Sequence, residues 1–501
     1  MSFGARARAR AVLSTLVAAL ALLPGCWLAS AARVGAGFAA KVTCSLAHDS
    51  GQDPQWVVDE YVVHEAKPIG PLLSWSVDEH GAQVRVGGVV RASAVLRPGL
   101  GCTLLPGDSA AQLVLPEGLP NVSRKALDAA TAWPLGAADP PPASPAIEAA
   151  LDRAFAEPDP THQRVRNTTA IVIAHDGKLV AERYRQGYAK TTPMLSWSMA
   201  KSVTASLVAI EIGDGRLALR EPAPVPEWSD PKDPRHAITL DQLLRMSSGL
   251  AFDETYGATN DVSRMLFTSP DVGAFAARSE LAAPPDTVWS YSSGTANIIA
   301  RILRDLHGRD LAAQVRFANE RLFDAADMTS AFIEPDVTGT FIGSSFVFMT
   351  ARDWARFGEL HRNDGVWDGR RILPEGWVRY VTTPTPKSPQ GNYGAHWWLN
   401  RGVPGHPEDR PWPRMPVDTF AATGHSGQFV LVIPSERLVI VRLGLSRPDG
   451  DDVGLEDLVV DVMRELGPGE ARSEPRAREV HPIESRRSSI LPSEVRGTVP
   501  E

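Results

Sequence analysis

The chain has 501 residues, of which 43% are hydrophobic and 22% are charged, and its formal net charge is −8 at pH 7. This composition is that of an ordinary globular protein, and the length allows two or more hydrophobic cores. An acidic chain offers no overall basic surface to a nucleic-acid backbone, so nucleic-acid binding is not expected.

The N-terminus has the pattern of an export signal. Three arginines within residues 5–10 precede the uncharged stretch 11–32, and Ala29-Ser30-Ala31 offers a small-residue cleavage site. We predict that residues 1–32 are a signal peptide or, because about 20 apolar residues can span a bilayer, a membrane anchor. Lipid attachment at Cys26 is a further alternative. The protein is expected to be exported, either periplasmic or membrane-anchored facing the periplasm of a bacterial envelope.

Residues 40–132 contain short runs of alternating apolar and polar side chains, as in 83–86, which predict a small, partly β accessory region. Cys44 and Cys102 lie in it and are the only cysteines besides Cys26. An oxidising compartment permits a disulfide between them, but the sequence does not decide whether it forms. The role of the region is equally open, and docking to a cell-wall polymer or a partner protein is one alternative.

A Pro-rich linker, residues 133–146, precedes the predicted main domain, residues 147–466. Within this domain, alternating runs flank turn residues in 169–183 and again in 429–443, which predicts two hairpins of one antiparallel sheet. Residues 469–501 are rich in Pro, Ser, Arg and Glu without apolar periodicity, and they are predicted to be disordered.

Helices are predicted between the two hairpins. Thr239 and Gln242 form a capping box at the start of one helix, and an apolar stripe before Gly308 marks another. The apolar stripe of a third helix runs from Met199 to Ile210. Hairpins at both ends of the domain with helices between them predict an α+β fold.

The third helix starts with Ser198-Met199-Ala200-Lys201. Residues three apart share one face of a helix, so the amine can reach the hydroxyl. The helix N-terminus would stabilise an alkoxide or oxyanion at Ser198, and burial would lower the pKa of Lys201 until it accepts a proton near neutral pH. Taken alone, this spacing often arises by chance, and a solvated Lys one turn after a Ser is then the ordinary interpretation.

A second polar motif, Tyr291-Ser292-Ser293, stands directly before the helix that ends near Gly308. A phenol at this entrance can share a proton with Ser198 and deliver it to a leaving group. The alternative is a Tyr that packs against the helix as a hydrophobic staple, which is the commoner interpretation of a lone Tyr.

A third motif, Gly424-His425-Ser426-Gly427-Gln428, opens the strand of the second hairpin and places His425 at its mouth. Glycines beside a strand allow close approach of the backbone, so a substrate could pair with this edge and a backbone N–H could bind an oxyanion. Taken alone, His425 is as well explained by a structural hydrogen bond as by catalysis.

The motifs at 198–201, 291–293 and 425–427, in this order, resemble the serine β-lactamase and penicillin-binding-protein hydrolase superfamily. The likeness is to its class C-like branch, and there to the esterases and amidases typified by 6-aminohexanoate-oligomer hydrolases. It covers most of residues 147–466. It implies a β-lactamase/transpeptidase-like fold, in which an antiparallel sheet flanked by helices meets an all-helical part. Further similar segments lie at 243–250, 252–256, 343–360 and 393–400.

The resemblance also implies a role for each site residue. Ser198 is implied as the acylated nucleophile, Lys201 as its proton partner and Tyr291 as the second acid/base residue. The backbone amides of Ser198 and Gln428 would form the oxyanion hole. The implied substrate-binding residues are His425, Ser426, Gly427 and Tyr256. For Tyr256, which matches a residue that closes over substrate, an exposed loop position is an equally good interpretation.

Two departures from the β-lactamase pattern bear on the substrate. His425-Ser426-Gly427 stands where those enzymes have Lys-Thr-Gly, and Tyr291-Ser292-Ser293 stands where class C enzymes have Tyr-x-Asn. A Lys ammonium pairs with a substrate carboxylate, whereas a His is only partly charged at neutral pH, so β-lactam turnover is expected to be slow or absent. The sequence predicts an exported serine hydrolase that cleaves ester or amide bonds of small acyl substrates through an acyl-enzyme on Ser198.

Two alternatives are kept: a β-lactamase or D-alanyl-D-alanine carboxypeptidase, and a non-catalytic receptor for cell-wall peptides. The sequence has no Zn-binding motif, no Gly-rich phosphate-binding motif and no Gly-x-Ser-x-Gly elbow, so no metal and no cofactor is expected. The expected partner is a small-molecule ester, amide or peptide substrate, and membrane attachment through the N-terminus stays open.

Overall fold

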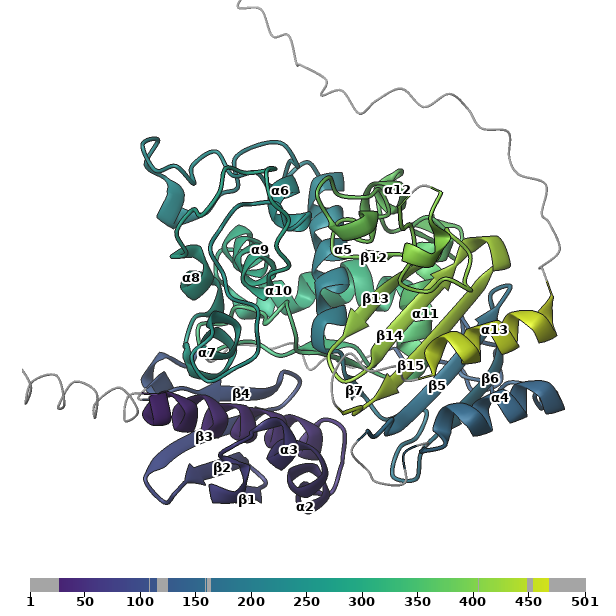
Figure 1. Cartoon of the computed structure of the whole chain (residues 1–501), viewed down its shortest axis with the longest axis horizontal. Helices are drawn as coiled ribbons and strands as arrows, with labels where there is room; N and C mark the ends of the chain where they lie inside the picture. Colours follow the sequence, from purple (N-terminus) through teal and green to yellow (C-terminus); the bar gives the residue numbers. More distant parts are fainter. Residues whose placement is uncertain are drawn as a thin grey trace, which may run out of the picture.

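The structure, a computed structural model, describes residues 27–107, 109–114, 125–157, 159, 164–403, 405–447 and 454–467. It has three parts: an N-terminal region (27–114), a connecting segment (125–144) and a main domain (145–467). Figure 1 shows the N-terminal region, in purple, below the main domain, whose large sheet lies on one side and whose helices gather on the other.

The main domain is built on a six-stranded antiparallel sheet. Its strands in spatial order are β12 (Trp398–Leu399), β13 (Phe420–Gly424), β14 (Gln428–Ile433), β15 (Leu438–Gly444), β5 (Thr168–His175) and β6 (Lys178–Tyr184). Both predicted hairpins are confirmed, as β5–β6 and β14–β15. Because β15 also pairs with β5, the two hairpins belong to one sheet, as predicted.

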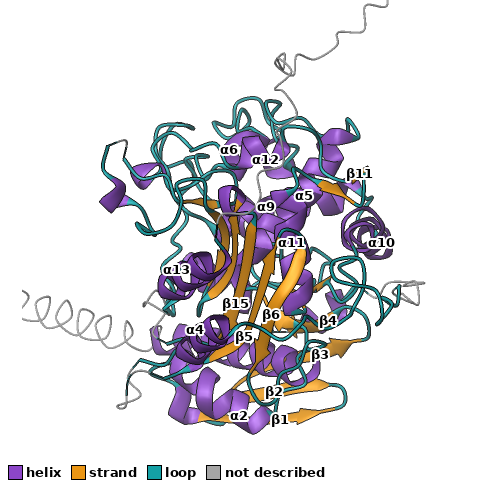
Figure 2. Ribbon diagram, turned by 90° about the vertical axis from the view of Figure 1, so that its right-hand side faces the viewer, coloured by secondary structure: helices purple, strands orange, loops and turns teal. Residues whose placement is uncertain are grey.

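Helices cover both faces of this sheet. Helices α4 (Pro145–Phe155) and α13 (Leu455–Leu466) lie on one face, and α11 (Ala351–Arg362) packs on the other (Figure 2). Side chains alternate along each strand, so Ile171 packs toward α4 and α13 whereas Val172 joins the core on the opposite face. A sheet covered in this way is apolar on both faces and forms a rigid platform for the β13–β14 turn.

A helical part lies beside the sheet (Figure 1). The helices predicted after Met199 and before Gly308 are confirmed as α5 (Ala200–Gly213) and α9 (Ser293–Leu306), and the capping box is confirmed at α6 (Leu240–Leu244). The combination of antiparallel sheet and helices confirms the predicted α+β fold class. The other elements of the main domain are α7 (Asp261–Thr268), α8 (Val272–Ala277), α10 (Leu311–Ala318), α12 (Trp377–Val381), β7 (Met194–Leu195), β8 (Phe332–Ile333), β9 (Val347–Met349), β10 (Val366–Trp367) and β11 (Arg370–Arg371).

The N-terminal region combines a long helix, residues 27–48, with a four-stranded antiparallel sheet. Cys44 on the helix and Cys102 on the last strand form a disulfide with their Cα atoms 6.0 Å apart, a pairing that the sequence had left open. The accessory region was predicted to begin at residue 40, but that position lies inside the helix. The elements are α2 (Pro54–Val57), α3 (Val63–Glu65), β1 (Leu73–Asp78), β2 (Gly81–Val86), β3 (Val90–Arg97) and β4 (Gly101–Leu105).

A buried ion pair joins the N-terminal region to the main domain. Lys41 Nζ lies 2.5 Å from Glu334 Oε2, and neither side chain is exposed. Glu334 also accepts hydrogen bonds from Ser45 Oγ (2.9 Å) and from the backbone N–H of Cys102 (2.5 Å). Removal of either charge would leave the other buried without its partner, so the docked arrangement depends on the presence of both.

The segment predicted as a Pro-rich linker, 133–146, lies along the main domain. The guanidinium of Arg356 on α11 donates to the backbone oxygen of Gly136 over 2.6 Å. One turn earlier, Arg352 donates to the backbone oxygen of Ala137 over 2.8 Å. Two arginines therefore hold a segment that has few backbone partners of its own.

The predictions for residues 1–26 and 469–501 fall outside the described part of the chain. Residues 27–32, the described end of the predicted export signal, form the first turns of the 27–48 helix, and Ala31 is buried there. Within the described residues, no helix combines the length and the apolar character needed to cross a membrane.

Candidate active site

The chain turns sharply at Trp197, directly before the predicted nucleophile. Trp197 has a φ of +44°, in the left-handed region that a bulky residue rarely adopts, and its side chain is fully buried. Ser198 follows in a short 3-10 turn, and α5 begins only at Ala200. The serine therefore precedes the helix that the sequence placed it in, at the end where unpaired N–H groups favour negative charge.

Lys201 reaches back from the first turn of α5 to Ser198. Its Nζ donates hydrogen bonds to Ser198 Oγ (2.9 Å), to Ser293 Oγ (2.9 Å) and to the backbone oxygen of Ser344 (3.2 Å). Burial lowers the pKa of Lys201 to about 8, against the opposing effect of the Glu254 charge. Roughly a tenth of the amine is therefore neutral at pH 7, and this fraction can act as a proton acceptor.

Glu254 extends this polar chain beyond Ser293, and its place there was not predicted from the sequence. Its Oε1 accepts a hydrogen bond from Ser293 Oγ (2.5 Å), and its Oε2 accepts one from the Ser293 backbone N–H (2.7 Å). Burial raises the pKa of Glu254, while the charge of Lys201 opposes the rise. Nothing in the sequence of a loop indicates that a Glu will take part in a site. The position of Glu254 two residues before Tyr256, in the segment 252–256 that resembles the superfamily, was the one indication.

Tyr291 lies in a group of aromatic rings beside Lys201. Lys201 Nζ is 4.8 Å from the centroid of the Tyr291 ring, a cation–π distance. The same ring contacts Tyr393 and Trp398, with centroids 5.8 and 5.5 Å away. Ser292 caps the N-terminus of α9, so Tyr291 stands at the entrance of that helix, as its sequence position indicated.

The turn between β13 and β14 lies against the nucleophile. Gly424 has no room for a side chain, because a Cβ there would be 2.3 Å from the Ser196 backbone oxygen and 3.1 Å from the Ser198 backbone nitrogen. Gly424 also pairs with Gln428 across the two strands. The chain segments that carry the Ser198 and Gln428 amides are thus both next to this glycine.

Arg442 and Tyr61 hold the same turn from behind. The buried guanidinium of Arg442 donates to the backbone oxygen of Gly427 over 2.6 Å, and burial lowers the pKa of Arg442 to about 9. Ser426 has a φ of +61°, and its hydroxyl oxygen lies 3.0 Å from that of Tyr61 in the N-terminal region. Neither contact was predicted, because Arg442 occurs within an otherwise apolar strand and Tyr61 lies 365 residues from Ser426 along the chain.

Side chains from three segments enclose the ring of His425. Its Nε2 lies 3.1 Å from the Glu65 carboxylate of α3 in the N-terminal region. Tyr256 stacks on the ring with centroids 5.6 Å apart, and Trp197 contacts it edge-on at 5.2 Å. The N-terminal region thus contributes directly to the surroundings of a predicted substrate-binding residue.

These residues meet around a cavity of about 390 Å³. Ser198, Tyr291, Tyr256, His425 and Gly427 line it, as does Glu254, whereas Lys201, Ser426 and Gln428 lie behind its wall. The structure therefore brings all the sequence-predicted site residues to one place. Most of the remaining wall is apolar and includes Trp398, Pro411, Trp412 and Phe429.

One group of side chains in the described part of the chain has the spacing of metal ligands: Asp49, Cys102 and Glu334. None of them lines the cavity. The sulfur of Cys102 is bonded to Cys44, and Glu334 is paired with Lys41, so these side chains are already engaged with one another and with the protein. The group does not fit a resident cation.

An antiparallel sheet flanked by helices, with a Ser-Lys pair where the sheet meets the helical part, defines the β-lactamase-like serine hydrolases. The family model described as Beta-lactamase matches residues 147–462, which is more than half of the chain. The protein therefore belongs to the Beta-lactamase family and is a serine hydrolase, which confirms the predicted resemblance.

Named relatives agree with this assignment. The chain is 26% identical to the 6-aminohexanoate-dimer hydrolase of Paenarthrobacter ureafaciens over 359 residues, 65% of this chain and 85% of that protein. A solved structure, "Putative 6-aminohexanoate-dimer hydrolase from Bacillus anthracis", matches with a TM-score of 0.51 and 20% identity over 84% of this chain and 97% of that one. A family VIII carboxylesterase matches with a TM-score of 0.50 and 14% identity over 64% of this chain and 98% of that one. At such identities the two structures establish the fold alone.

Proposed function

We propose that the protein is an exported serine hydrolase that cleaves ester or amide bonds of small acyl substrates through an acyl-enzyme on Ser198. The observation that carries the proposal is the 2.9 Å contact between Lys201 Nζ and Ser198 Oγ, made by a buried amine whose pKa is lowered to about 8. A neutral amine at this distance accepts the hydroxyl proton as the serine attacks a carbonyl.

The catalytic cycle has two halves. Ser198 Oγ bonds to the carbonyl carbon, and the amides of Ser198 and Gln428 stabilise the oxyanion that forms. The bond to the alcohol or amine then breaks, and the leaving group takes a proton from Tyr291. In the second half, water attacks the acyl-enzyme and gives a proton to the Tyr291 oxygen. The bond to Ser198 Oγ then breaks, Lys201 returns its proton to that oxygen, and the acid is released.

Ser293 and Glu254 act as positioning residues for Lys201. The Ser293 hydroxyl accepts from Lys201 and donates to Glu254, which holds Nζ at its distance from Ser198. The negative charge of Glu254 raises the proton affinity of the amine, while desolvation lowers it. The pKa of Lys201 results from the balance of these two effects.

An ester or a small amide suits the site better than an anionic β-lactam. His425 stands where β-lactamases carry a Lys, and its ring contacts the Glu65 carboxylate at 3.1 Å. The carboxylate of Glu65 beside His425 disfavours binding of a substrate that carries a carboxylate of its own. The relative in Paenarthrobacter ureafaciens is named 6-aminohexanoate-dimer hydrolase. A linear dimer of an amino acid is joined by an amide bond, so this name also favours amide or ester substrates over a β-lactamase or D-alanyl-D-alanine carboxypeptidase activity.

The proposal is tested by comparing p-nitrophenyl butyrate with a chromogenic cephalosporin on the purified protein. We expect the ester to be hydrolysed faster, and Ser198→Ala to abolish the activity together with the mass increase that a fluorophosphonate adds to the protein. Ser76→Ala, at an exposed serine of β1, is the matched control and should retain both. Faster turnover of the cephalosporin would reverse the ranking of substrates.

The second alternative, a non-catalytic receptor, has a distinct signature in the same experiment. A receptor would bind muropeptides yet remain unlabelled by the fluorophosphonate. We expect labelling, because a binder has no need of a Ser198 and a Tyr291 that line one cavity with Lys201 in contact with both.

Export is proposed from the N-terminal sequence pattern, and the Cys44–Cys102 disulfide supports it because such bonds persist in oxidising compartments. Mass spectrometry of the protein isolated from its host distinguishes the three forms. A chain starting at Ala32 indicates a cleaved signal peptide, a lipidated Cys26 indicates a lipoprotein, and an intact N-terminus indicates an anchor.

A further inference from the structure

A second cavity, of about 290 Å³, lies between the N-terminal region and the main domain. Val34 and Phe38 of the long N-terminal helix line one side, together with Ile69, which follows α3. Phe267 of α7 and Trp197 line the other side. All five side chains are buried and apolar. Glu65 and Lys67 also line the cavity, so an uncharged group fits against the apolar side chains between the helix and α7 rather than throughout the cavity.

This cavity adjoins the catalytic one. Tyr256 and His425 line both cavities, and their stacked rings form the partition between them. Trp197, the residue directly before Ser198, lines the second cavity, whereas Ser198 lines the first. A substrate bound at Ser198 is therefore separated from the second cavity by one pair of rings.

The two members of the partition differ in how firmly they are held. His425 lies between Glu65 and Trp197 and is largely buried. Tyr256 is 44% exposed and stands in the loop between α6 and α7. Exposed side chains change rotamer more readily than buried ones, so Tyr256 is the member of the partition that we expect to move when a substrate binds.

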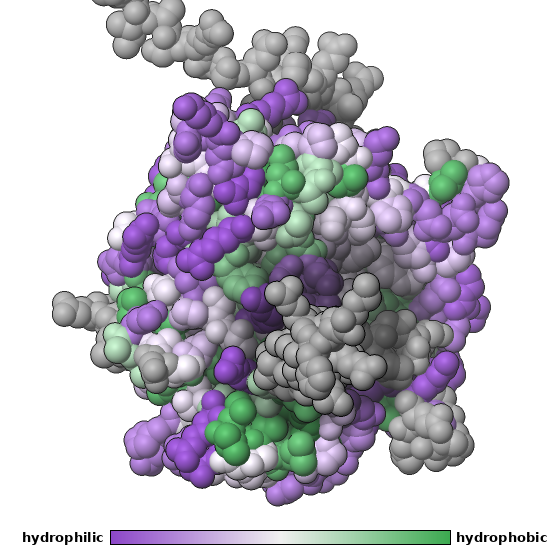
Figure 3. Space-filling model, turned by 60° about the vertical axis from the view of Figure 1, so that its left-hand side comes forward, coloured by the Kyte–Doolittle hydropathy of each residue, from purple (hydrophilic) through white to green (hydrophobic). Residues whose placement is uncertain are grey.

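The apolar character continues from this cavity to the surface. Trp27 lines the cavity and is 45% exposed, and Leu28, Leu72 and Val89 are further exposed hydrophobic residues of the N-terminal region. Figure 3 shows hydrophobic residues gathered toward the lower end of the molecule, at the height where Figure 1 places this region.

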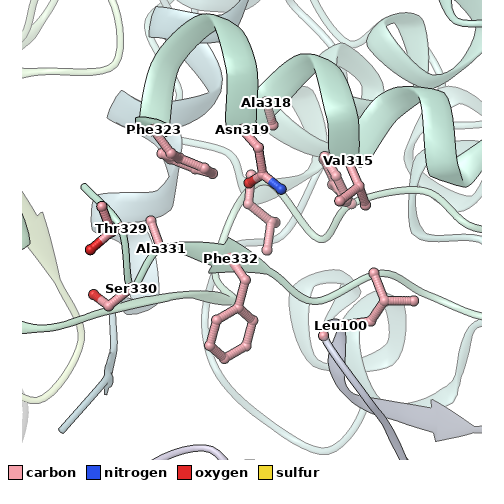
Figure 4. A pocket seen from close by; sticks show the side chains of 12 residues that line it. Leu100, Val315, Ala318, Asn319, Phe323, Thr329, Ser330, Ala331 and Phe332 are labelled. Carbon is pink, nitrogen blue, oxygen red and sulfur yellow. The ribbon is translucent and has the colours of Figure 1, made fainter. Parts of the chain in front are cut away.

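A third cavity at the same junction lacks these properties. In Figure 4, Leu100 of the N-terminal region and Val315, Phe323 and Phe332 of the main domain surround a space of about 190 Å³. It shares no lining residue with the catalytic cavity. Nothing therefore connects it to Ser198, and it is a packing gap between the two parts.

We propose that the second cavity is a subsite for an uncharged alkyl or aryl chain of the substrate, reached past Tyr256. This inference rests on the proposed function and adds a substrate class, namely esters or amides with one apolar chain that extends beyond the catalytic cavity. The cavity volume lies at the lower limit of sites for drug-sized ligands, about 300–1,000 Å³, so it accommodates a short chain. The apolar chain of the substrate is part of either its acyl group or its leaving group, and an alkyl or aryl chain has the same chemistry in both.

Two series of ester substrates, assayed with the full-length protein, distinguish a chain on the acyl group from a chain on the leaving group. p-Nitrophenyl esters from acetate to octanoate lengthen the acyl side, and alkyl butyrates from methyl to octyl lengthen the alcohol side. We expect kcat/KM to rise about tenfold between the four- and eight-carbon chains in one of the series, which assigns the side. No rise in either series overturns the subsite and leaves the proposed function standing. Absence of all ester hydrolysis, short esters included, overturns the proposed function and the subsite with it.

Variants that fill the cavity test its location. Ala258→Phe narrows it from the loop, and we expect the tenfold preference for the long chain to disappear. Ala251→Phe, at an exposed position near the start of the same loop, is the matched control and should retain the preference. A second variant, Val34→Trp, fills the cavity from the long N-terminal helix. Its control is Arg33→Trp, at an exposed position of the same helix. Because two variants fill the cavity from different sides, misfolding of one does not decide the result. Circular dichroism melting verifies folding, and a long-chain preference retained in either folded, cavity-filled variant contradicts the proposal.

Discussion

The two sides of the catalytic cavity are built in different ways. On one side, Ser198 and Lys201 come from a single segment, and their 2.9 Å contact follows from the first turn of α5. On the other side, His425 is enclosed by Tyr256 and by Glu65, which lies 360 residues away along the chain. The reactive group therefore depends on local helix geometry, whereas the wall that faces the substrate depends on docking of the N-terminal region.

Because the two sides are built differently, we expect residues on the Ser198 side to control the rate of catalysis and residues on the His425 side to control which substrates bind. Changes on the Ser198 side should remove transition-state stabilisation for every substrate. Changes on the His425 side should alter which substrates bind while leaving the nucleophile intact. Variants on each side of the cavity can test this separation of catalysis from substrate selection.

The largest effect is expected for Lys201→Met, which keeps the volume of the side chain and removes the amine. Without a proton acceptor beside Ser198, kcat/KM for p-nitrophenyl butyrate should fall by about 10³-fold or more. Lys178→Met, at an exposed position of β6, is the control and should have normal activity. A loss of less than tenfold would remove Lys201 from the mechanism.

The docking of the N-terminal region is tested by Glu334→Gln. This change leaves the buried Lys41 without its counter-charge, so the free energy of unfolding should fall by about 3 kcal/mol, measured by urea denaturation. Glu408→Gln, at an exposed carboxylate, should change it by less than about 0.5 kcal/mol. Equal stability of the two variants would show that the ion pair does not hold the interface.

The Glu254→Gln variant tests how Lys201 is tuned. In the wild type, kcat/KM should rise with pH through about 8, because the lowered pKa of Lys201 places its loss of a proton there. The Glu254 charge raises that pKa, so its removal should shift the rising limb to lower pH, with a loss of about tenfold at the optimum. Asp253→Asn, one residue away and exposed, should leave the limb in place. A limb that moves to higher pH contradicts the assigned role.

The smallest effect is expected for Glu65→Gln, which removes a carboxylate from the His425 wall. The ratio of kcat/KM for an anionic ester, p-nitrophenyl hemisuccinate, to that for p-nitrophenyl butyrate should rise about fivefold, because like-charge repulsion is lost. Glu79→Gln, on the exposed surface of the N-terminal region, should leave this ratio unchanged. An unchanged ratio in Glu65→Gln would mean that Glu65 does not act on bound substrate.

The hairpins, the main helices and the site motifs could be predicted because each has a signal that repeats within a few residues. Strand alternation revealed β5–β6 and β14–β15, and the apolar stripe after Met199 revealed α5. The place of Glu254 in the site could not be predicted, since nothing in a loop sequence distinguishes a carboxylate that binds a buried hydroxyl from one that faces solvent. The contact of Arg442 with the Gly427 backbone was not predicted either, because a single Arg within an otherwise apolar strand does not indicate which backbone group it binds.

By itself, the sequence determined the family, the α+β fold and the Ser198–Lys201 pair, because helical and strand periodicities and short motifs are local properties. The folded protein was needed to show that Cys44 meets Cys102, that Glu254 binds Ser293 and that Glu65 and Tyr61 reach the 425–427 turn. These contacts join segments that are distant along the chain. Such contacts form only when packing within and between the two regions offsets the entropy of bringing those segments together.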